Sequence, residues 1–195
     1  MGRNYAEHRK EMGGLDRDEP FFFQKPHDAV FQSPIVFYPK GTYKLSYEAE
    51  LVAIVGGRPA PNIYGYALGV DLTKRDIQTE AKNKGRPWES SKAFDKSGLV
   101  GEIMPLGSLS DTCTLQFIQN GQVKQSAKIS DMIWSVPELI SKLESQDFSV
   151  REGDFIFTGT PAGVGELSIG DHCEVCLVDS EGHNVLPKLS FTVAR

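Results

Sequence analysis

The segment Tyr47-Glu-Ala-Glu-Leu-Val-Ala-Ile-Val55 decides how this chain is organised. Its second half is an unbroken apolar run, which is typical of a buried strand. Successive side chains of a strand point to opposite faces, so Glu48 and Glu50, two positions apart, should project from the same face. The segment therefore predicts a core strand that begins with two carboxylates side by side.

A second strand is predicted from Tyr64 to Val70, and Asp71 follows it directly. Neighbouring anions raise each other's pKa, so three ionised carboxylates held together are best explained by a cation between them. A set made only of Glu48, Glu50 and Asp71 offers hard oxygen ligands, which favour Mg²⁺, Mn²⁺ or Ca²⁺ over zinc. The alternative is a solvated strand face, where a Glu-x-Glu pair is common.

A helix is predicted after Asp71, from Thr73 to about Asn83, with Thr73 as its N-cap. Arg75 and Gln78 are three residues apart and should share the helical face close to Asp71.

Short strands with one more helix are predicted for the rest of the chain. Asn120-Gly121 between two apolar runs is the strongest short signal for a β-hairpin. The helix covers Ser135 to Leu143, with Pro137 in its first turn. The expected strands are Phe21–Pro26, Pro34–Pro39, Thr112–Ile118, Gln122–Ile129, Val150–Gly153, Asp154–Thr158 and His172–Val178. We therefore predict one domain over residues 1–195, of α+β class and predominantly β, with a few short helices.

Composition excludes several classes of protein. The formal net charge is −5, with no block of Lys or Arg, so nucleic-acid binding is not expected. No apolar run approaches the roughly 20 residues that span a bilayer, and the charged N-terminus is unlike a signal peptide, so we expect a cytoplasmic protein with no membrane association. The three cysteines suit a reducing compartment. Cys173 and Cys176 should lie on opposite faces of a strand and act as packing residues.

Three further groups could carry chemistry. Thr158-Gly-Thr-Pro-Ala-Gly-Val-Gly165 lacks the Lys of a Walker loop, but its backbone N–H groups and the Thr160 hydroxyl could hold a small carboxylate. A tight connection between strands is the alternative. Lys92 is a lone cation, which on its own is more often a surface lysine. His8 and Glu11 share a helical face and could be a general base with its orienting carboxylate, or a surface ion pair.

Six motifs taken together resemble the fumarylacetoacetate hydrolase family. They are Gly2-Arg-Asn-Tyr-Ala-Glu-His8, Tyr47-Glu-Ala-Glu-Leu51, Gly69-Val-Asp-Leu-Thr-Lys-Arg-Asp-Ile-Gln78, Lys84-Gly-Arg-Pro-Trp88, Ser91-Lys-Ala-Phe94 and Thr158–Gly165. Within the family, the short chain and Phe21-Phe-Phe-Gln-Lys-Pro26 resemble bacterial acylpyruvate hydrolases, especially fumarylpyruvate hydrolases of aromatic-compound degradation. Members usually carry a strand before the Gly-x-Asn-Tyr motif, so a longer or a trimmed native N-terminus is expected.

The resemblance implies a mixed β-sheet roll or sandwich, a homodimer, and a Mg²⁺ or Mn²⁺ ion bound by Glu48, Glu50 and Asp71. It also implies that Arg75, Gln78, Gly159 and Thr160 line the substrate pocket, that His8 and Glu11 activate water, and that Lys92 is catalytic. The expected substrate is a small β-dicarbonyl acid.

The chemistry of these residues agrees with hydrolysis of a 3-acylpyruvate. Water attack on the distal carbonyl would leave pyruvate enolate, which a divalent ion and Lys92 could stabilise. Decarboxylation of oxaloacetate gives the same enolate without water attack, and isomerisation of a related β-dicarbonyl acid is a third reading. A metal-binding scaffold without catalytic activity is the alternative from another class.

Overall fold

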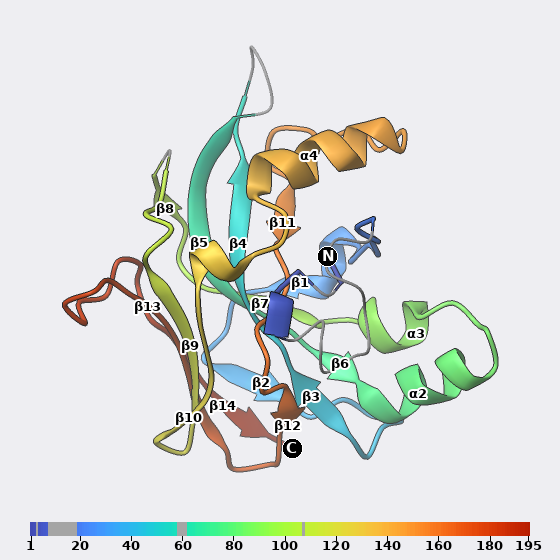
Figure 1. The fold of residues 1–195 in the computed structure, drawn as a ribbon. Coiled ribbons are helices and arrows are strands. Elements are labelled where there is room, and N and C mark those ends of the chain that lie inside the picture. Colours follow the sequence, from blue (N-terminus) through green and yellow to red (C-terminus); the bar gives the residue numbers. More distant parts are fainter. Residues whose placement is uncertain (3, 8–18, 58–61, 107) are drawn as a thin grey trace.

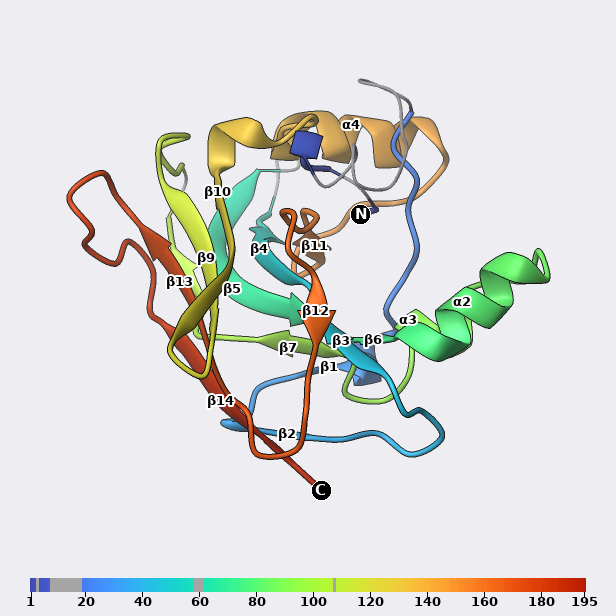
Figure 2. The same cartoon turned by 60° about the horizontal axis from the view of Figure 1, so that its bottom comes forward.

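The computed structural model describes residues 1–2, 4–7, 19–57, 62–106 and 108–195. Within them, strands predominate and helices are few and short, which confirms the predicted α+β, mainly β, class. Figures 1 and 2 show strands curling around a common interior, with the helices at the periphery. The helical segments whose bounds lie within the described residues are η1 (His27–Ala29), α2 (Arg75–Asn83), α3 (Glu89–Lys92), η2 (Ile129–Asp131) and α4 (Val136–Ser145).

The first sheet has six strands in the order β1-β7-β5-β4-β11, with β8 paired to β5. Its members are β1 (Val30–Phe31), β4 (Ala49–Val55), β5 (Ile63–Asp71), β7 (Gly98–Val100), β8 (Met104–Pro105) and β11 (Phe155–Phe157). Every residue of β4 is buried, which explains its continuous apolar run. Because β4 and β5 are antiparallel and Glu50 pairs with Gly69, the beginning of β4 lies beside the end of β5.

The second sheet has five strands in the order β10-β9-β13-β14-β2, and a third sheet has three in the order β12-β3-β6. The second comprises β2 (Ile35–Phe37), β9 (Thr114–Gln119), β10 (Gln122–Lys128), β13 (His172–Val178) and β14 (Leu189–Ala194). The third comprises β3 (Leu45–Tyr47), β6 (Thr73–Lys74) and β12 (Gly165–Glu166). Leu51 of β4, Leu115 of β9 and Leu139 of α4 belong to one hydrophobic cluster, so the core joins both large sheets and α4.

Most predicted elements are present. The Asn120-Gly121 hairpin joins β9 and β10, with both residues at positive φ. Helix α4 begins after Ser135, whose backbone N–H donates to the Glu138 carboxylate at 2.9 Å. No described helix has the length and apolar character needed to cross a membrane.

Three local predictions were wrong. Thr73 does not cap α2: it belongs to β6, paired with Ser46, and the N-cap position falls on Lys74. Phe21–Pro26 is not a strand, because only Phe21 forms an isolated bridge, with Gly2. Val150–Gly153 is a turn before β11, with Gly153 at φ +87°.

Candidate metal and substrate site

The three predicted carboxylates come together at one end of β4 and β5. Glu48 lies between β3 and β4, Glu50 is the second residue of β4, and Asp71 is the last residue of β5. The Asp71 N–H donates to the Glu48 carbonyl at 2.8 Å, which extends the β4–β5 pairing to these two residues. One carboxylate oxygen from each of the three residues lies within 4.8 Å of the others. The sequence prediction of a carboxylate cluster is therefore confirmed as an arrangement in space.

Lys92 joins two of these carboxylates. Its Nζ lies 2.7 Å from Glu48 Oε2 and 2.7 Å from Asp71 Oδ2, and its side chain is 3% exposed. Burial would lower the pKa of Lys92, but Asp71 and Glu48 outweigh burial and raise it. Lys92 is therefore a buried, protonated ammonium group and not the surface lysine of the alternative reading.

Lys25 is a second buried cation, which sequence reasoning missed. Its Nζ lies 2.8 Å from Asp71 Oδ1, and it donates to Ser97 Oγ at 3.0 Å and to the Lys92 carbonyl. Burial lowers the pKa of Lys25, partly opposed by Asp71, so Lys92 holds its proton more strongly than Lys25 does. The available signal was its position in Phe21-Phe-Phe-Gln-Lys-Pro26, one of the segments that carried the family resemblance.

Arg75 and Gln78 lie together beside Glu48. The predicted shared face of α2 is confirmed, because Arg75 Nη1 donates to Gln78 Oε1 at 2.7 Å. Arg75 Nη2 donates to Glu48 Oε1 at 2.7 Å, and Nε donates to Ser46 Oγ at 3.3 Å. Burial would raise the pKa of Glu48, but Lys92 and Arg75 hold it well below its ordinary value.

Glu50 has a different environment from Glu48. Its Oε2 accepts the Gly159 N–H at 2.6 Å. Burial, reinforced by the negative charges of Asp71 and Glu48, raises the pKa of Glu50 to about 8. Ionisation of Glu50 is therefore unfavourable in this site, and a divalent ion nearby would stabilise the ionised carboxylate.

The loop from Thr158 to Gly165 packs directly against this site. The Thr160 hydroxyl donates to the Ala49 carbonyl at 2.8 Å, and the Gly159 N–H is taken by Glu50. Two of the donors predicted for a substrate carboxylate, the Thr160 hydroxyl and the Gly159 N–H, thus have protein partners. The Thr160 N–H next to Gly159 donates to no acceptor among the described residues, so it is one of the loop donors that a substrate could use.

The residues at the site match the donor set of a hard divalent ion. Asp71 Oδ1 is buried, and its close contact is the Lys25 ammonium group at 2.8 Å. Three buried carboxylates that converge in this way can hold Mg²⁺ or Mn²⁺. The predicted dyad, His8 and Glu11, lies outside the described residues.

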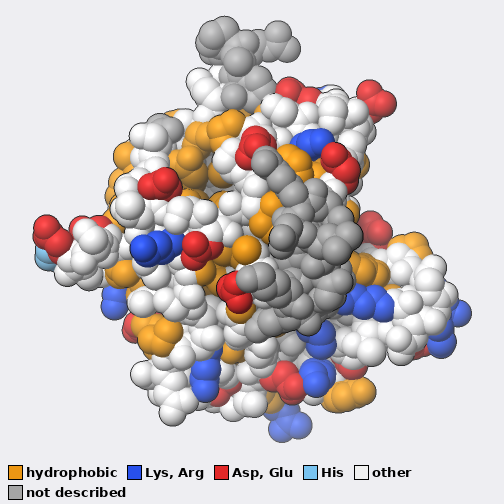
Figure 3. Space-filling model, in the orientation of Figure 1, with side chains coloured by type: hydrophobic (Ala, Val, Ile, Leu, Met, Phe, Trp, Pro, Cys, Tyr) orange, Lys and Arg blue, Asp and Glu red, His pale blue; other side chains and the backbone are white. Residues whose placement is uncertain are grey.

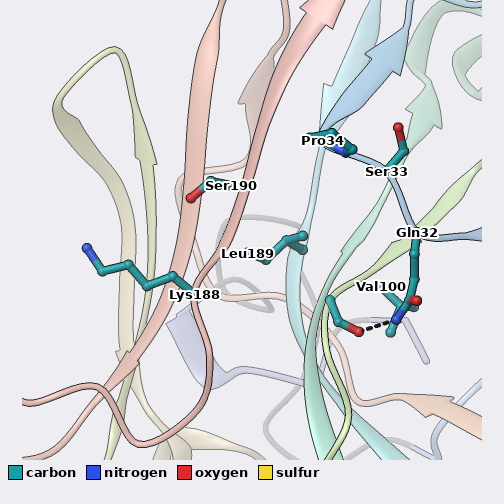
Figure 4. Close-up of a pocket in the computed structure, with 8 residues that line it drawn as sticks. Gln32, Ser33, Pro34, Val100, Lys188, Leu189 and Ser190 are labelled. Carbon is teal, nitrogen blue, oxygen red and sulfur yellow. Dashed lines mark hydrogen bonds between the residues drawn. The ribbon is translucent and has the colours of Figure 1, made fainter.

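A separate shallow pocket of about 330 Å³ shares no lining residue with the carboxylate cluster (Figure 4). Gln32 Nε2 donates to the Gly101 carbonyl at 2.7 Å across one side of it. Its one charged lining residue, Lys188, lies 3.6 Å from Glu174. This pocket brings together no groups suited to acid–base or metal chemistry, whereas the carboxylate cluster does.

The surface charge is mixed on the side seen in Figure 1. On this face, basic side chains occur at several separate places with acidic ones among them (Figure 3). This distribution agrees with the small negative net charge.

A mainly β scaffold with a buried carboxylate cluster flanked by cations is typical of a protein that binds a hard divalent ion. The family model described as "Fumarylacetoacetate (FAA) hydrolase C-terminal" matches residues 1–194, and the chain belongs to this family. The chain is 37% identical over 164 residues to the fumarylpyruvate hydrolase of Ralstonia sp, which covers 79% of this chain and 85% of the relative. It is 39% identical over 207 aligned positions to the mitochondrial oxaloacetate tautomerase of Homo sapiens, covering 100% of this chain and 90% of that protein.

A solved structure shares the fold. It is the fumarylpyruvate hydrolase from Pseudomonas aeruginosa in complex with Mn²⁺ and pyruvate, with a TM-score of 0.87 and 38% identity, covering 99% of this chain and 87% of the other. The expected family and fold are therefore confirmed, and a relative with bound Mn²⁺ agrees with the expected cofactor.

Proposed function

We propose that the protein is a metal-dependent hydrolase that cleaves the C–C bond of 3-acylpyruvates, with fumarylpyruvate, cleaved to fumarate and pyruvate, as the expected substrate. The observation that carries this proposal is the buried Lys92 ammonium group, 2.7 Å from both Glu48 and Asp71. It places a fixed positive charge beside the carboxylates, where the charge of a pyruvate enolate would develop. Relatives named fumarylpyruvate hydrolase support this choice of substrate.

Glu48, Glu50 and Asp71 would hold Mg²⁺ or Mn²⁺, which would supply Lewis-acid polarisation of the 2-oxo acid group. Lys92, with Lys25 behind it, stabilises the negative charge of the enolate. The Thr160 N–H holds the substrate carboxylate beside Gly159, and Arg75 orients Gln78, whose amide meets the substrate or the attacking water.

His8, oriented by Glu11, takes the proton from the water that attacks the distal carbonyl. A C–O bond forms there while the adjacent C–C bond breaks, and its electron pair leaves as pyruvate enolate, which takes back the proton held by His8 to give pyruvate. Hydrolysis therefore depends on a base that acts on water, in addition to the cations that stabilise the enolate.

Keto–enol isomerisation of oxaloacetate is the second candidate, because a relative of similar identity is named oxaloacetate tautomerase. This reaction, like decarboxylation of oxaloacetate, uses the enolate-stabilising cations but needs no attacking water. Hydrolysis therefore needs a base that acts on water, decarboxylation needs no base, and isomerisation needs a base only to move the substrate's own proton.

Turnover of fumarylpyruvate, acetylpyruvate and oxaloacetate by metal-stripped protein, with and without Mn²⁺, tests the proposal. We expect Mn²⁺-dependent cleavage of the acylpyruvates, lost in His8→Ala and retained in His27→Ala, an exposed histidine of η1. Full acylpyruvate cleavage by His8→Ala would overturn the mechanism, and Mn²⁺-dependent turnover of oxaloacetate alone would favour the second candidate. The proposal includes a single domain, a homodimer and a cytoplasmic location; light scattering after gel filtration measures the oligomeric state.

A further inference from the structure

Gln125 is a buried glutamine on an otherwise largely exposed strand. It is 1% exposed, and it is the single buried residue of β10. The register of β10 against β9 shifts between Val123 and Gln125, which leaves Lys124 as the extra residue of a β-bulge. Bulges redirect side chains, and this one directs Gln125 into the protein.

The bulge is also in close contact with the Thr158–Gly165 loop. Gly163 has φ +93°, and a Cβ at this position would lie 2.1 Å from the Lys124 carbonyl oxygen. Strand β10 of the second sheet and the loop at the carboxylates are therefore packed backbone to backbone.

Both N–H donors and the carbonyl oxygen of the Gln125 amide are used. Nε2 donates to Thr160 Oγ1 at 2.8 Å and to the Pro161 carbonyl at 2.8 Å, and Oε1 accepts the Ala49 N–H at 3.1 Å. The Thr160 hydroxyl in turn donates to the Ala49 carbonyl at 2.8 Å. Gln125, Thr160 and Ala49 thus form a closed ring of hydrogen bonds in the interior.

Ala49 is the residue between Glu48 and Glu50, and Thr160 follows Gly159, whose N–H donates to Glu50. The ring therefore fixes the backbone on both sides of the Glu50 carboxylate. We infer that Gln125 is a positioning residue that orients the two glutamate ligands of the metal through Ala49 and Thr160. The inference rests on the proposed function only in assigning a metal ion to these glutamates.

Calorimetric titration of metal-stripped protein with Mn²⁺ measures metal affinity and tests this role independently of turnover. Gln125→Met preserves the length of the side chain and removes the amide. We expect its Mn²⁺ Kd to rise roughly 10- to 100-fold, as when outer-shell partners of metal ligands are removed. Gln122→Met, on the exposed end of the same strand, should keep the wild-type Kd.

Two variants at Thr160 decide the question if Gln125→Met fails to fold. Thr160→Val breaks the ring and should also raise the Mn²⁺ Kd, whereas Thr160→Ser keeps the hydroxyl and should restore it. In the double variant Gln125→Met/Thr160→Val, the loss of Mn²⁺ binding free energy should be smaller than the sum of the two single losses, because both substitutions break the same ring.

A folded Gln125→Met or Thr160→Val protein with the wild-type Mn²⁺ Kd would overturn the inference. Wild-type protein that binds no Mn²⁺ would overturn both the metal site and this role. Normal wild-type Mn²⁺ binding with no acylpyruvate cleavage would reject the proposed function, while a raised Kd in Gln125→Met would still support Gln125.

Discussion

Asn4 Nδ2 donates a hydrogen bond to the Thr158 carbonyl at 2.8 Å. The same amide group donates to the Trp134 carbonyl at 2.9 Å, and its Oδ1 accepts the Trp134 N–H at 2.8 Å. Asn4 thus attaches the segment that leads to His8 both to the loop beside Glu50 and to the residues before α4. Figure 2 shows the N-terminus close to α4 and β11.

Replacement of Asn4 by Leu should impair folding stability and catalysis together. Asn4 is fully buried, and each backbone group left without its partner costs about 1–3 kcal/mol of unfolding free energy. Urea unfolding and acylpyruvate cleavage measure the two effects. Asn83→Ala, at the exposed end of α2, is the matched control and should be close to wild type.

Replacement of Lys92 by Met should reduce kcat while Mn²⁺ binding is retained. The variant loses the cation that stabilises the enolate, which we expect to cost on the order of 100-fold in kcat. Removing a positive charge beside Glu48 and Asp71 should keep or tighten Mn²⁺ affinity in a calorimetric titration. Lys84→Met, an exposed partner of Glu80, serves as the control, and unchanged kcat in Lys92→Met would contradict the proposed role.

Replacement of Gly159 by Ala should be far more damaging than the same change at Gly153. Both glycines have positive φ, +99° and +87°, so both variants carry a backbone strain of about 1 kcal/mol or more. A Cβ on Gly159 would also lie 2.7 Å from Asn4 Cβ, whereas one on Gly153 meets nothing within 4 Å. The difference between the losses of unfolding free energy in Gly159→Ala and Gly153→Ala measures the cost of the contact with Asn4. Equal losses in the two variants would show that this contact costs nothing.

Asp171 should stabilise the protein in a pH-dependent way. Its Oδ2 accepts from Gln119 at 2.6 Å and from the Ser168 N–H at 2.7 Å, and its Oδ1 accepts from Asn120 at 2.8 Å. Burial would raise the pKa of Asp171, but these bonds outweigh it and hold the pKa below the ordinary value of 3.8.

A depressed pKa in the folded state contributes stability above the unfolded pKa, and this stability is lost as the pH falls through the folded value. Asp171→Asn should therefore lower the unfolding free energy by about 1.5–3 kcal/mol at pH 7, with a smaller difference from wild type at pH 3. Urea unfolding at both pH values checks this, and Asp95→Asn, on the exposed turn after α3, is the control. A difference that stays constant with pH would show that the charge of Asp171 is not responsible.

The three cysteines should be unreactive in the folded protein. All are free and buried, and burial raises the pKa of the Cys173 thiol to about 12, so almost no thiolate is present at pH 8. A thiol reagent should modify none of them before unfolding and all three in denaturant. Rapid modification of the native protein would contradict this arrangement.

Local signals predicted much of the fold. The apolar run of β4 and the Asn120-Gly121 turn lie within single stretches of chain, and the structure confirms both. Thr73 was misread for a physical reason: its backbone pairs with Ser46, and its hydroxyl donates to Glu48 at 3.4 Å, so it cannot also cap α2.

The carboxylates of the site, Glu48, Glu50 and Asp71, could be predicted because each is a charged residue next to the apolar sequence of a strand. The roles of Lys25 and Gln125 depend on long-range contacts, Lys25 with Asp71 and Gln125 with Ala49. Gln125 also depends on a bulge that brings it to the interior face, and strand alternation in the sequence does not indicate where a bulge occurs.

The cations around the carboxylates have a further consequence for how metal binding and substrate binding are coupled. The side-chain cations Lys25, Lys92 and Arg75 equal Glu48, Glu50 and Asp71 in number, so the charges of these six side chains cancel when all are ionised. A divalent ion brings an excess of two positive charges, which a substrate with two carboxylates cancels. Metal and dianionic substrate therefore favour each other's binding by the same factor, as thermodynamic linkage requires.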